Sequence, residues 1–422
     1  MAHKTSIGGT AYDIGGGKTL VEGTSYSVKN GKVLIDGTEY DISFILPATV
    51  LDLWSGDNSN SIFCITYANG YWVVGGRYID EGNDLCYARI AYATSLDGNW
   101  TIRDLWSSLN EEYEYYDYHH ISDIAYGNGY WVVSGYYAES SADYARIAYA
   151  TSLSGTWTIK DLWGDGDQWD NTAHCVIYAN GYWVVGGKYY NGTRWYGEIA
   201  YATRPSGSWT TDWLWRDSGN YDTGIYCITY ADGYWVVGGE YYDSGDDALY
   251  ARIAYTSNLS RTWTTKDLWN SSDHRSDTIF CITYTDGYWV VGGGFNDKDN
   301  GACYARIAYA TSPGGDWTIK DIWSGGTYYN EIRCIAYGNG YWMVGGRYCG
   351  DGMDTYARIA YATSLSGPWT IKDLCVDSHS DGDTVYSAIY ADNYWVVGGR
   401  TSENLFDAPA FIAYSENIES FG

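Results

Sequence analysis

The sequence predicts an all-β fold built from one four-stranded unit that is repeated seven times. Each unit holds four short segments rich in aromatic and β-branched residues, separated by Gly, Asn, Asp and Ser, a pattern typical of strands and turns. One phrase, YWVVGG with small variations, also returns at intervals of 59, 52, 52, 54, 53 and 53 residues. Its tryptophans are Trp72, Trp131, Trp183, Trp235, Trp289, Trp342 and Trp395.

The first complete unit shows the four segments in order. They read IFCITY, YWVVGG, YARIAYAT and WTIRDLW. In the last segment Trp100 and Ile102 alternate with Thr101 and Arg103, as the two faces of a strand require. Four antiparallel strands per unit without intervening helices are typical of a β-propeller, and an open solenoid is the competing architecture.

The two ends of the repeat array favour a closed ring. The final unit stops after its third strand, AFIAYSENIESFG, and has no fourth strand. A strand-like segment without a unit of its own, Val50–Trp54, precedes the first unit. This segment would complete the last blade, whereas an open array would need capping repeats. We therefore expect residues 47–422 to form a seven-bladed β-propeller of four-stranded antiparallel blades, closed by the N-terminal strand.

The positions that repeat are interpreted as scaffold. Asn-Gly before YWVVGG is a strong signal for a two-residue hairpin turn, and Gly-Gly permits a bulge or a close approach of backbones. Cysteines occupy one slot in five units, too far apart to pair with each other, so we expect buried, reduced thiols and no disulfides. These cysteines are Cys64, Cys175, Cys227, Cys281 and Cys334.

A repeated arginine on the third strand is interpreted as half of a structural ion pair, with a clamp for carboxylates as the alternative. Each such unit carries an aspartate on its fourth strand, at a diagonal position. Where Glu198 replaces the arginine, Trp213 replaces the aspartate, and Phe411 would face Asp52. The expected pairs are Arg89–Asp104, Arg146–Asp161, Arg252–Asp267, Arg306–Asp321 and Arg358–Asp373.

The turn before the fourth strand carries a family resemblance. It reads SLDGNW at Ser95–Trp100 and SPGGDW at Ser312–Trp317. This resembles a shortened Asp-box hairpin (Ser-x-Asp-x-Gly-x-x-Trp) of sialidase-like propellers, and most copies lack its Asp. The box is structural in that family, so the resemblance implies the fold. The Phe-Arg-Ile-Pro motif of sialidases is not supplied by YARIAY, so we expect no sialidase activity.

Residues 1–46 have a separate period of 14 residues. Tyr12, Tyr26 and Tyr40 lie in GTAYDI, GTSYSV and GTEYDI. Strands this short are too few to bury a core alone, so we expect a small β module that folds on a partner or as a homo-oligomer. The pattern resembles Gly-Thr-x-Tyr-x-Ile repeats in virion structural proteins of phages of Gram-positive hosts. The resemblance implies attachment to other virion proteins through residues 1–46.

Composition excludes several classes of partner. With 25 Lys and Arg against 52 Asp and Glu, the net charge is −27, which opposes nucleic acid and anionic membranes. No apolar run is long enough to span a bilayer, and the first residues lack the apolar centre of a secretory signal, so we expect a soluble chain.

The segments after the second and fourth strands vary between copies, whereas the turns after the first and third do not. Because strands alternate in direction, the variable segments would all emerge on one face. They combine Tyr and Trp with small polar residues, which suits recognition of proteins or sugars. The candidate ligand-binding residues are Tyr115, Tyr116, Tyr118, Trp169, Tyr190, Trp195, Tyr196, Tyr242 and Tyr329.

No catalytic residue, metal ligand or cofactor is assigned from the sequence. Glycoside hydrolysis needs two carboxylates at a defined separation, and no motif chooses a pair. The histidines lie in different loops without ligand spacing. Two aspartate runs are weak candidates for calcium, since neither matches an EF-hand loop. These are Asp165, Asp167 and Asp170, and Asp377, Asp381 and Asp383.

The leading hypothesis from the sequence is a non-enzymatic phage virion protein, assembled in the reducing host cytoplasm. Its propeller would present a receptor-binding or adhesive face to host surface glycans or proteins, as a fibre or tail component. Two alternatives stay open: a polysaccharide-degrading enzyme on the same scaffold, and a purely structural capsid or tail protein.

Overall fold

The computed structural model divides into two compact units, Met1–Pro47 and Ala48–Gly422. It describes residues 3–7, 10–15, 18–21, 24–29, 32–35, 38–41, 48–54, 60–80, 82, 85–109, 119–139, 142–164, 171–216, 223–271, 277–297, 301–325, 329–350, 355–377, 383–401 and 410–421.

The first unit is a six-stranded antiparallel sheet in chain order. The 14-residue period corresponds to one hairpin, because Tyr12, Tyr26 and Tyr40 each pair with the residue seven positions before them. The strands are β1 (His3–Ile7), β2 (Thr10–Gly15), β3 (Lys18–Val21), β4 (Thr24–Lys29), β5 (Lys32–Ile35) and β6 (Thr38–Asp41).

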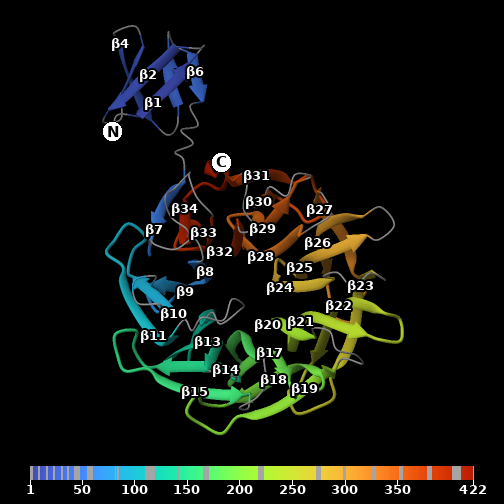
Figure 1. Ribbon diagram of the computed structural model, residues 1–422. Coiled ribbons are helices and arrows are strands. Elements are labelled where there is room, and N and C mark those ends of the chain that lie inside the picture. The colour runs from blue at the N-terminus through green and yellow to red at the C-terminus, as the bar shows by residue number, and fades with distance from the viewer. Residues whose placement is uncertain are drawn as a thin grey trace. The chain divides into compact units, whose positions relative to one another are not determined.

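The second unit is a β-propeller of four-stranded antiparallel blades (Figure 1). The first strands are β8 (Ser61–Ala68), β12 (His120–Gly127), β16 (Thr172–Ala179), β20 (Gly224–Ala231), β24 (Thr278–Thr285), β28 (Glu331–Gly338) and β32 (Thr384–Ala391). The second strands are β9 (Tyr71–Asp80), β13 (Tyr130–Glu139), β17 (Tyr182–Tyr190), β21 (Tyr234–Asp243), β25 (Tyr288–Asp297), β29 (Tyr341–Cys349) and β33 (Tyr394–Arg400). The third strands are β10 (Leu85–Ala93), β14 (Ala142–Ala150), β18 (Trp195–Ala202), β22 (Ala248–Thr256), β26 (Ala302–Ala310), β30 (Thr355–Ala362) and β34 (Ala410–Ser415). The fourth strands are β11 (Thr101–Leu109), β15 (Thr158–Trp163), β19 (Thr210–Arg216), β23 (Thr264–Ser271), β27 (Thr318–Gly325), β31 (Thr370–Asp377) and β7 (Thr49–Asp52).

The first strands form a ring around a central channel. Each contacts the first strand of the next repeat, and β32 contacts β8. Five repeats form separate four-stranded sheets. The repeats β24–β27 and β28–β31 share one eight-stranded sheet, joined through the single pair Gly294 and Glu331.

The predicted strand exchange is confirmed. β7 pairs with β34, and Phe411 lies opposite Asp52 as expected. The end of the chain adds a contact that the sequence did not predict. A 3₁₀ turn at Ile418–Ser420 follows the last strand, and Ser420 O accepts a hydrogen bond from Ala48 N at 3.2 Å. Ile418 and Phe421 are buried in the same core cluster, so both chain ends of this unit close one blade.

The repeated phrase is scaffold, as predicted. Its seven tryptophans are all 2% exposed or less. A Cβ on the second glycine, Gly76, would lie 1.9 Å from the carbonyl oxygen of Ser61 on the first strand. A Cβ on the first glycine, Gly75, would lie 2.6 Å from Ile121 of the next blade. The glycines therefore permit the close approach of strands within a blade and of neighbouring blades.

Fourth-strand tryptophans link neighbouring blades. Trp106 Nε1 donates a hydrogen bond to the carbonyl of Tyr136 in the next blade at 3.0 Å. The same bond joins Trp163 to Lys188, Trp215 to Glu240, Trp269 to Gly294 and Trp323 to Arg347.

The cysteine slot is buried and reduced, as predicted. The eight described cysteines have free thiols, and all but Cys281 are buried. Two repeats place a polar residue in this slot instead. Asp123 accepts a hydrogen bond from Val176 N at 2.9 Å, and Ser387 accepts one from Ile65 N at 3.1 Å. Both hydrogen bonds connect the first strand of one repeat to the first strand of the next repeat.

The five predicted Arg–Asp ion pairs are all present, with N–O distances of 2.5 to 2.6 Å. The expected diagonal register was wrong. Arg89 and Asp104 are direct cross-strand partners because a register shift lies between Ala88 and Arg89. Glu198 lies opposite Trp213, in agreement with the predicted joint replacement.

Candidate binding site in the central channel

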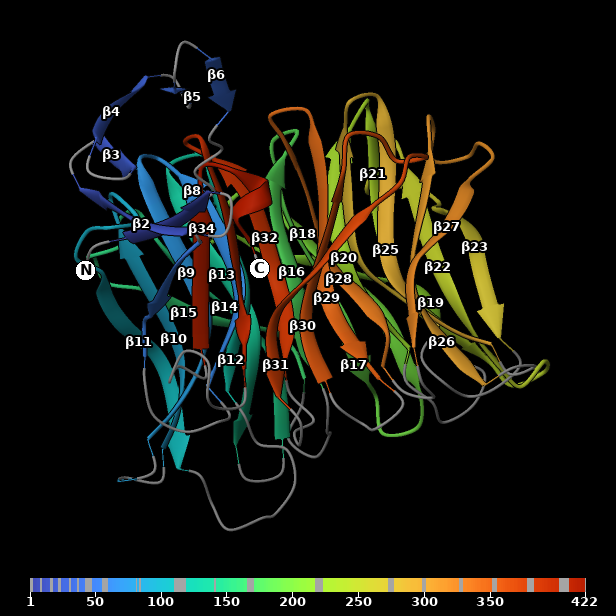
Figure 2. The ribbon, with the colours of Figure 1, turned by 90° about the horizontal axis from the view of Figure 1, so that it is seen from above.

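The two faces of the propeller differ as the sequence predicted. The antiparallel order brings the ends of the second and fourth strands to one face, here called the loop face (Figure 2). The opposite turn face carries the hairpin turns between first and second strands. At Asn69 and Gly70 these have φ of 51° and 76°, the left-handed values that favour Asn-Gly.

Every first strand has a β-bulge at its third residue, near the loop face. In β8 the register shifts between Ile62 and Cys64, which leaves Phe63 as the extra residue. The same shift occurs in each of the other six first strands. The extra residues, here called the bulge residues, are Phe63, Ser122, His174, Tyr226, Phe280, Arg333 and Tyr386.

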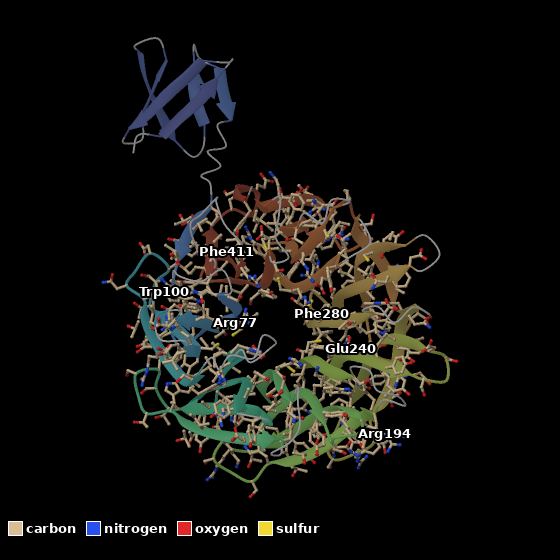
Figure 3. The ribbon with its side chains drawn as sticks, in the orientation of Figure 1. Arg77, Trp100, Arg194, Glu240, Phe280 and Phe411 are labelled. Atoms are coloured by element: carbon tan, nitrogen blue, oxygen red, sulfur yellow. The ribbon has the colours of Figure 1, made fainter. Side chains whose placement is uncertain are left out.

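The seven bulge residues, together with His120, line one pocket of about 240 Å³ in the channel. Aromatic contacts run between neighbouring repeats: ring centres lie 4.7 Å apart for His174 and Tyr226, and 5.5 Å apart for Tyr226 and Phe280. Phe63 and Tyr386 lie 4.9 Å apart where the ring closes. The pocket therefore has a largely aromatic wall, and Figure 3 shows Phe280 beside the central opening.

Arg333 is the cation of this wall. Its guanidinium carbon lies 3.7 Å from the centre of the Phe280 ring. Its terminal nitrogen lies 2.9 Å from Glu331, which also contacts Arg347 at 2.7 Å. Burial acts to raise the pKa of Glu331, but the two guanidiniums outweigh it and hold that pKa below its usual value. The cluster therefore carries a net positive charge.

A second polar cluster lies in the two preceding repeats. Tyr226 donates its hydroxyl proton to Glu240 at 2.6 Å, and Thr278 donates to the other carboxylate oxygen at 2.6 Å. Glu240 is buried. Glu240 and Glu331 thus both accept hydrogen bonds from neighbouring side chains.

Three buried polar atoms of the pocket wall have no hydrogen-bond partner among the described residues: Ser122 Oγ, His174 Nε2 and Arg333 Nε. Burial lowers the pKa of His174 well below its usual value, and Lys188 lowers it further, so this imidazole is neutral. These atoms are available to a bound polar group, because a buried polar atom without a partner is costly.

Four of the seven repeats place a cation at the loop-face end of the bulge, here called the mouth of the pocket. The residue after Gly-Gly on each second strand pairs with the first residue of the first strand, two positions before the bulge residue and closer to the loop face. The Nε of Arg400 is buried and has no hydrogen-bond partner among the described residues. The mouth cations are Arg77, Lys188, Arg347 and Arg400. The equivalent position of another repeat holds Glu240, and Arg347 is paired with Glu331, so the four mouth cations outnumber these two carboxylates in a chain of net charge −27.

Three predicted binding residues lie beside these cations. Tyr190 and Trp195 are cross-strand partners with ring centres 4.5 Å apart, and Lys188 Nζ lies 4.5 Å from the Trp195 ring. Tyr329 is 53% exposed, and the Arg347 guanidinium lies 4.3 Å from its ring. The structure therefore groups these aromatic residues with the mouth cations.

The remaining predicted residues divide into two groups. Tyr242 was expected to be exposed, but it is only 3% exposed, because it folds back so that its hydroxyl donates to Asp247 at 2.6 Å. Tyr196 lies on the other face of its blade, beside Tyr189. Tyr115, Tyr116, Tyr118 and Trp169 lie outside the described residues.

The calcium candidates remain without support. Asp165, Asp167, Asp170 and Asp381 lie outside the described residues. Within the described ranges, no group of three or more His, Cys, Asp or Glu side chains is placed to hold a metal ion. The same ranges contain no helix that is long and apolar enough to cross a membrane.

His119 has a structural role. It is fully buried, and its Nδ1 accepts a hydrogen bond from Ala138 N at 3.3 Å. Burial lowers its pKa to about 3, in keeping with a neutral acceptor. In other repeats the side-chain oxygen of a polar residue accepts the equivalent hydrogen bond, from the backbone N–H 19 positions later in the chain. These residues are Asn60, Asn171, Thr223, Asp277 and Asn330.

The bulge residues were missed in the sequence. A signal was present, because the second position of IFCITY changes from copy to copy while its neighbours largely repeat. Alternation alone would have assigned this position to a blade interface. Only the bulge turns it into the channel.

The chain matches no known protein family, and no curated protein matches its sequence. Among solved structures, the phage phi92 endosialidase superposes with a TM-score of 0.50 at 11% identity, over 90% of this chain and 71% of the endosialidase. Trypanosoma rangeli sialidase in complex with sialic acid gives a TM-score of 0.40 at 12% identity, over 93% of this chain but 58% of the sialidase. The first likeness shows a sialidase-like β-propeller fold, as the Asp-box resemblance implied.

Proposed function

We propose that this chain is a receptor-binding protein of a phage virion that holds an acidic host surface glycan at its loop face, with the central pocket as the deepest part of the site. In this proposal the eight-stranded sheet counts as two blades, so the propeller has seven. One observation carries the proposal: the equivalent bulge positions differ in identity from repeat to repeat and all line the same pocket. Positions that serve only packing have no reason to diverge in this way.

The chemistry of the pocket wall supports a sugar ligand. Phe63, Tyr226, Phe280 and Tyr386 offer aromatic faces to the apolar face of a sugar ring. Ser122 and His174 offer polar atoms without partners among the described residues to its hydroxyl groups. Trp195 and Tyr329 extend the aromatic surface outward beside the mouth cations.

The charge of the mouth supports an acidic group on that sugar. The Nε of Arg400 has no hydrogen-bond partner among the described residues, so it is available to an acidic group of a ligand. A guanidinium binds a carboxylate through charge-assisted hydrogen bonds, which are stronger than neutral ones.

The assignment to a virion rests on two supports. The 14-residue repeat of residues 1–46 resembles virion structural proteins, and we propose that this unit attaches the chain to other virion proteins. The phage endosialidase shares the propeller fold, although 11% identity carries no activity across.

The proposal is tested with cell-wall polysaccharides of Gram-positive bacteria, measuring both saturable binding and release of oligosaccharides. Arg400→Met is expected to weaken binding about tenfold, the effect of one charge-assisted hydrogen bond. Trp195→Ala and Phe280→Ala are expected to weaken it as well. Arg261→Met removes an exposed cation from the turn face and is the matched control.

The outcomes separate the functions. Binding that is lost in Arg400→Met and kept in Arg261→Met supports the proposal. Binding that is sensitive only on the turn face would show that the faces are inverted. If the protein neither binds the polysaccharides nor releases oligosaccharides from them, the result favours the purely structural alternative.

A glycan-degrading enzyme is the second candidate function, and the Tyr226–Glu240 hydrogen bond favours it. A tyrosine hydroxyl beside a carboxylate is a nucleophile with an adjacent base, a combination that serves glycosidic chemistry. In that case oligosaccharides are released by the parent protein. Tyr226→Phe would abolish release and leave binding in place.

A further inference from the structure

The outer half of the blades contains a repeated site for a guanidinium. Arg89 pairs with Asp104, and its guanidinium carbon lies 3.6 Å from the centre of the Tyr78 ring. Four other repeats show the same arrangement at 3.5 to 3.8 Å: Arg146 on Tyr137, Arg252 on Tyr241, Arg306 on Phe295 and Arg358 on Tyr348. In each, a cation lies on an aromatic ring and beside a carboxylate.

The blade formed by β16–β19 keeps the rings but replaces the cation. Tyr189 and Tyr196 lie 5.8 Å apart, compared with 6.0 Å for Tyr78 and Tyr87. Glu198 stands at the position of the arginine, and Trp213 at the position of the aspartate. The carboxylate has moved to the third strand, and among the described residues of this repeat no arginine is found on the Tyr189 ring as in the other five.

The register places the four side chains on one face of the blade. Tyr189 pairs with Tyr196, and Glu198 pairs with Trp213. Tyr196 and Glu198 are two residues apart on one strand, so they point the same way. The Trp213 ring lies 6.0 Å from Tyr196 at an angle of 68°. Three rings therefore flank one carboxylate, and this group is here called the outer cage.

The outer cage is open on one side. Trp213 is 52% exposed, although tryptophan is a residue that proteins tend to cover. Glu198 is only 8% exposed, so it is much more deeply buried than Trp213. A ligand approaching past Trp213 would meet aromatic faces first and the carboxylate last.

Glu198 has no hydrogen-bond or ion-pair partner among the described residues. Arg216 approaches the Trp213 ring at 5.8 Å but forms no ion pair with Glu198. Burial raises the pKa of Glu198 to about 7, and repulsion from Asp212 contributes further. A buried carboxylate without a counter-charge is destabilising, and a cation would relieve this cost.

We propose that the outer cage, formed by Tyr189, Tyr196, Glu198 and Trp213, binds the cationic group of a ligand, a guanidinium or an alkylated ammonium. The ligand would take the place that an internal arginine fills in five other repeats. Aromatic faces attract organic cations through their quadrupole, and a desolvated carboxylate adds a direct charge pair. The site is separate from the channel and does not depend on the glycan proposal.

The test uses the full chain titrated with N-methylguanidinium chloride at pH 8, followed by ligand-detected NMR against a sodium chloride blank. The parent protein is expected to bind saturably. Glu198→Gln keeps the shape but removes the charge, and it is expected to weaken binding at least about tenfold.

The matched variant is the double change Glu198→Arg with Trp213→Asp, which rebuilds the internal ion pair of the other repeats. It is expected to abolish binding while the melting temperature stays at or above that of the parent. The proposal is overturned if the parent shows no saturable binding, or if a folded variant of either kind binds as well as the parent.

Discussion

The interfaces between blades repeat from copy to copy, whereas the wall of the central channel does not. The tryptophan of the repeated phrase is buried in all seven copies. On the first strand beside it, the bulge position holds Phe, Ser, His, Tyr, Phe, Arg and Tyr in turn. Packing fixes a residue that must fill the same space seven times. The bulge residue lines the channel and does not have to fill a fixed space between blades, so its identity can differ in each blade.

The largest effect is expected where the ring closes. Deleting residues 1–55 removes β7 and leaves the edge of β34 unpaired, so the protein is expected to aggregate. Deleting residues 1–44 leaves β7 in place and is expected to give a soluble propeller. Size-exclusion chromatography with light scattering distinguishes the two. Equal behaviour of the truncations would contradict closure by strand exchange.

The next effect contrasts an interface with the channel wall. Trp183→Ala empties a fully buried position between blades and is expected to cost about 3 to 5 kcal/mol of the free energy of unfolding. Phe280→Ala removes a partly exposed ring of the channel wall and is expected to cost much less. Denaturant unfolding measures both. A comparable loss for Phe280→Ala would mean that the channel wall, too, is chiefly structural.

A smaller effect is expected at the outer cage and depends on pH. The folded-state pKa of Glu198 is about 7, above its ordinary value of 4.5. Its contribution to stability is therefore fully present below pH 4.5 and is lost as the pH rises through 7. Relative to Glu198→Gln, the parent is expected to lose about 3 kcal/mol over this window. A constant difference between the two unfolding curves from pH 4.5 to 8 would exclude the raised pKa.

The smallest effect is expected from a repeated ion pair. Arg252 contacts Asp267 through two hydrogen bonds, at 2.5 and 2.9 Å, but the aspartate is partly exposed. A double-mutant cycle with Arg252→Met and Asp267→Asn is expected to give a coupling energy of about 1 kcal/mol. Zero coupling would assign the role of the arginine to its contact with Tyr241 alone.

The candidate site could be predicted only in part. Trp195 and Tyr329 were found because aromatic residues in variable segments stand out from the repeats. Tyr242 has the same sequence context, yet it is buried, because a hydrogen bond to Asp247 in the same hairpin turns it inward. Whether such a tyrosine is buried or exposed depends on the local geometry of the hairpin, which residue type alone does not indicate.

The sequence by itself determined the repeat, its strands, the strand exchange and the pairing of five arginines with five aspartates. These follow from periodicity and from replacements that occur together, which are properties of the chain order. Only the tertiary structure decided what lines the channel, because a bulge of one residue reverses the direction of a side chain. It also brought Arg333, Tyr226 and Tyr386 of different blades to one pocket, since residues separated by whole repeats meet only when the ring closes.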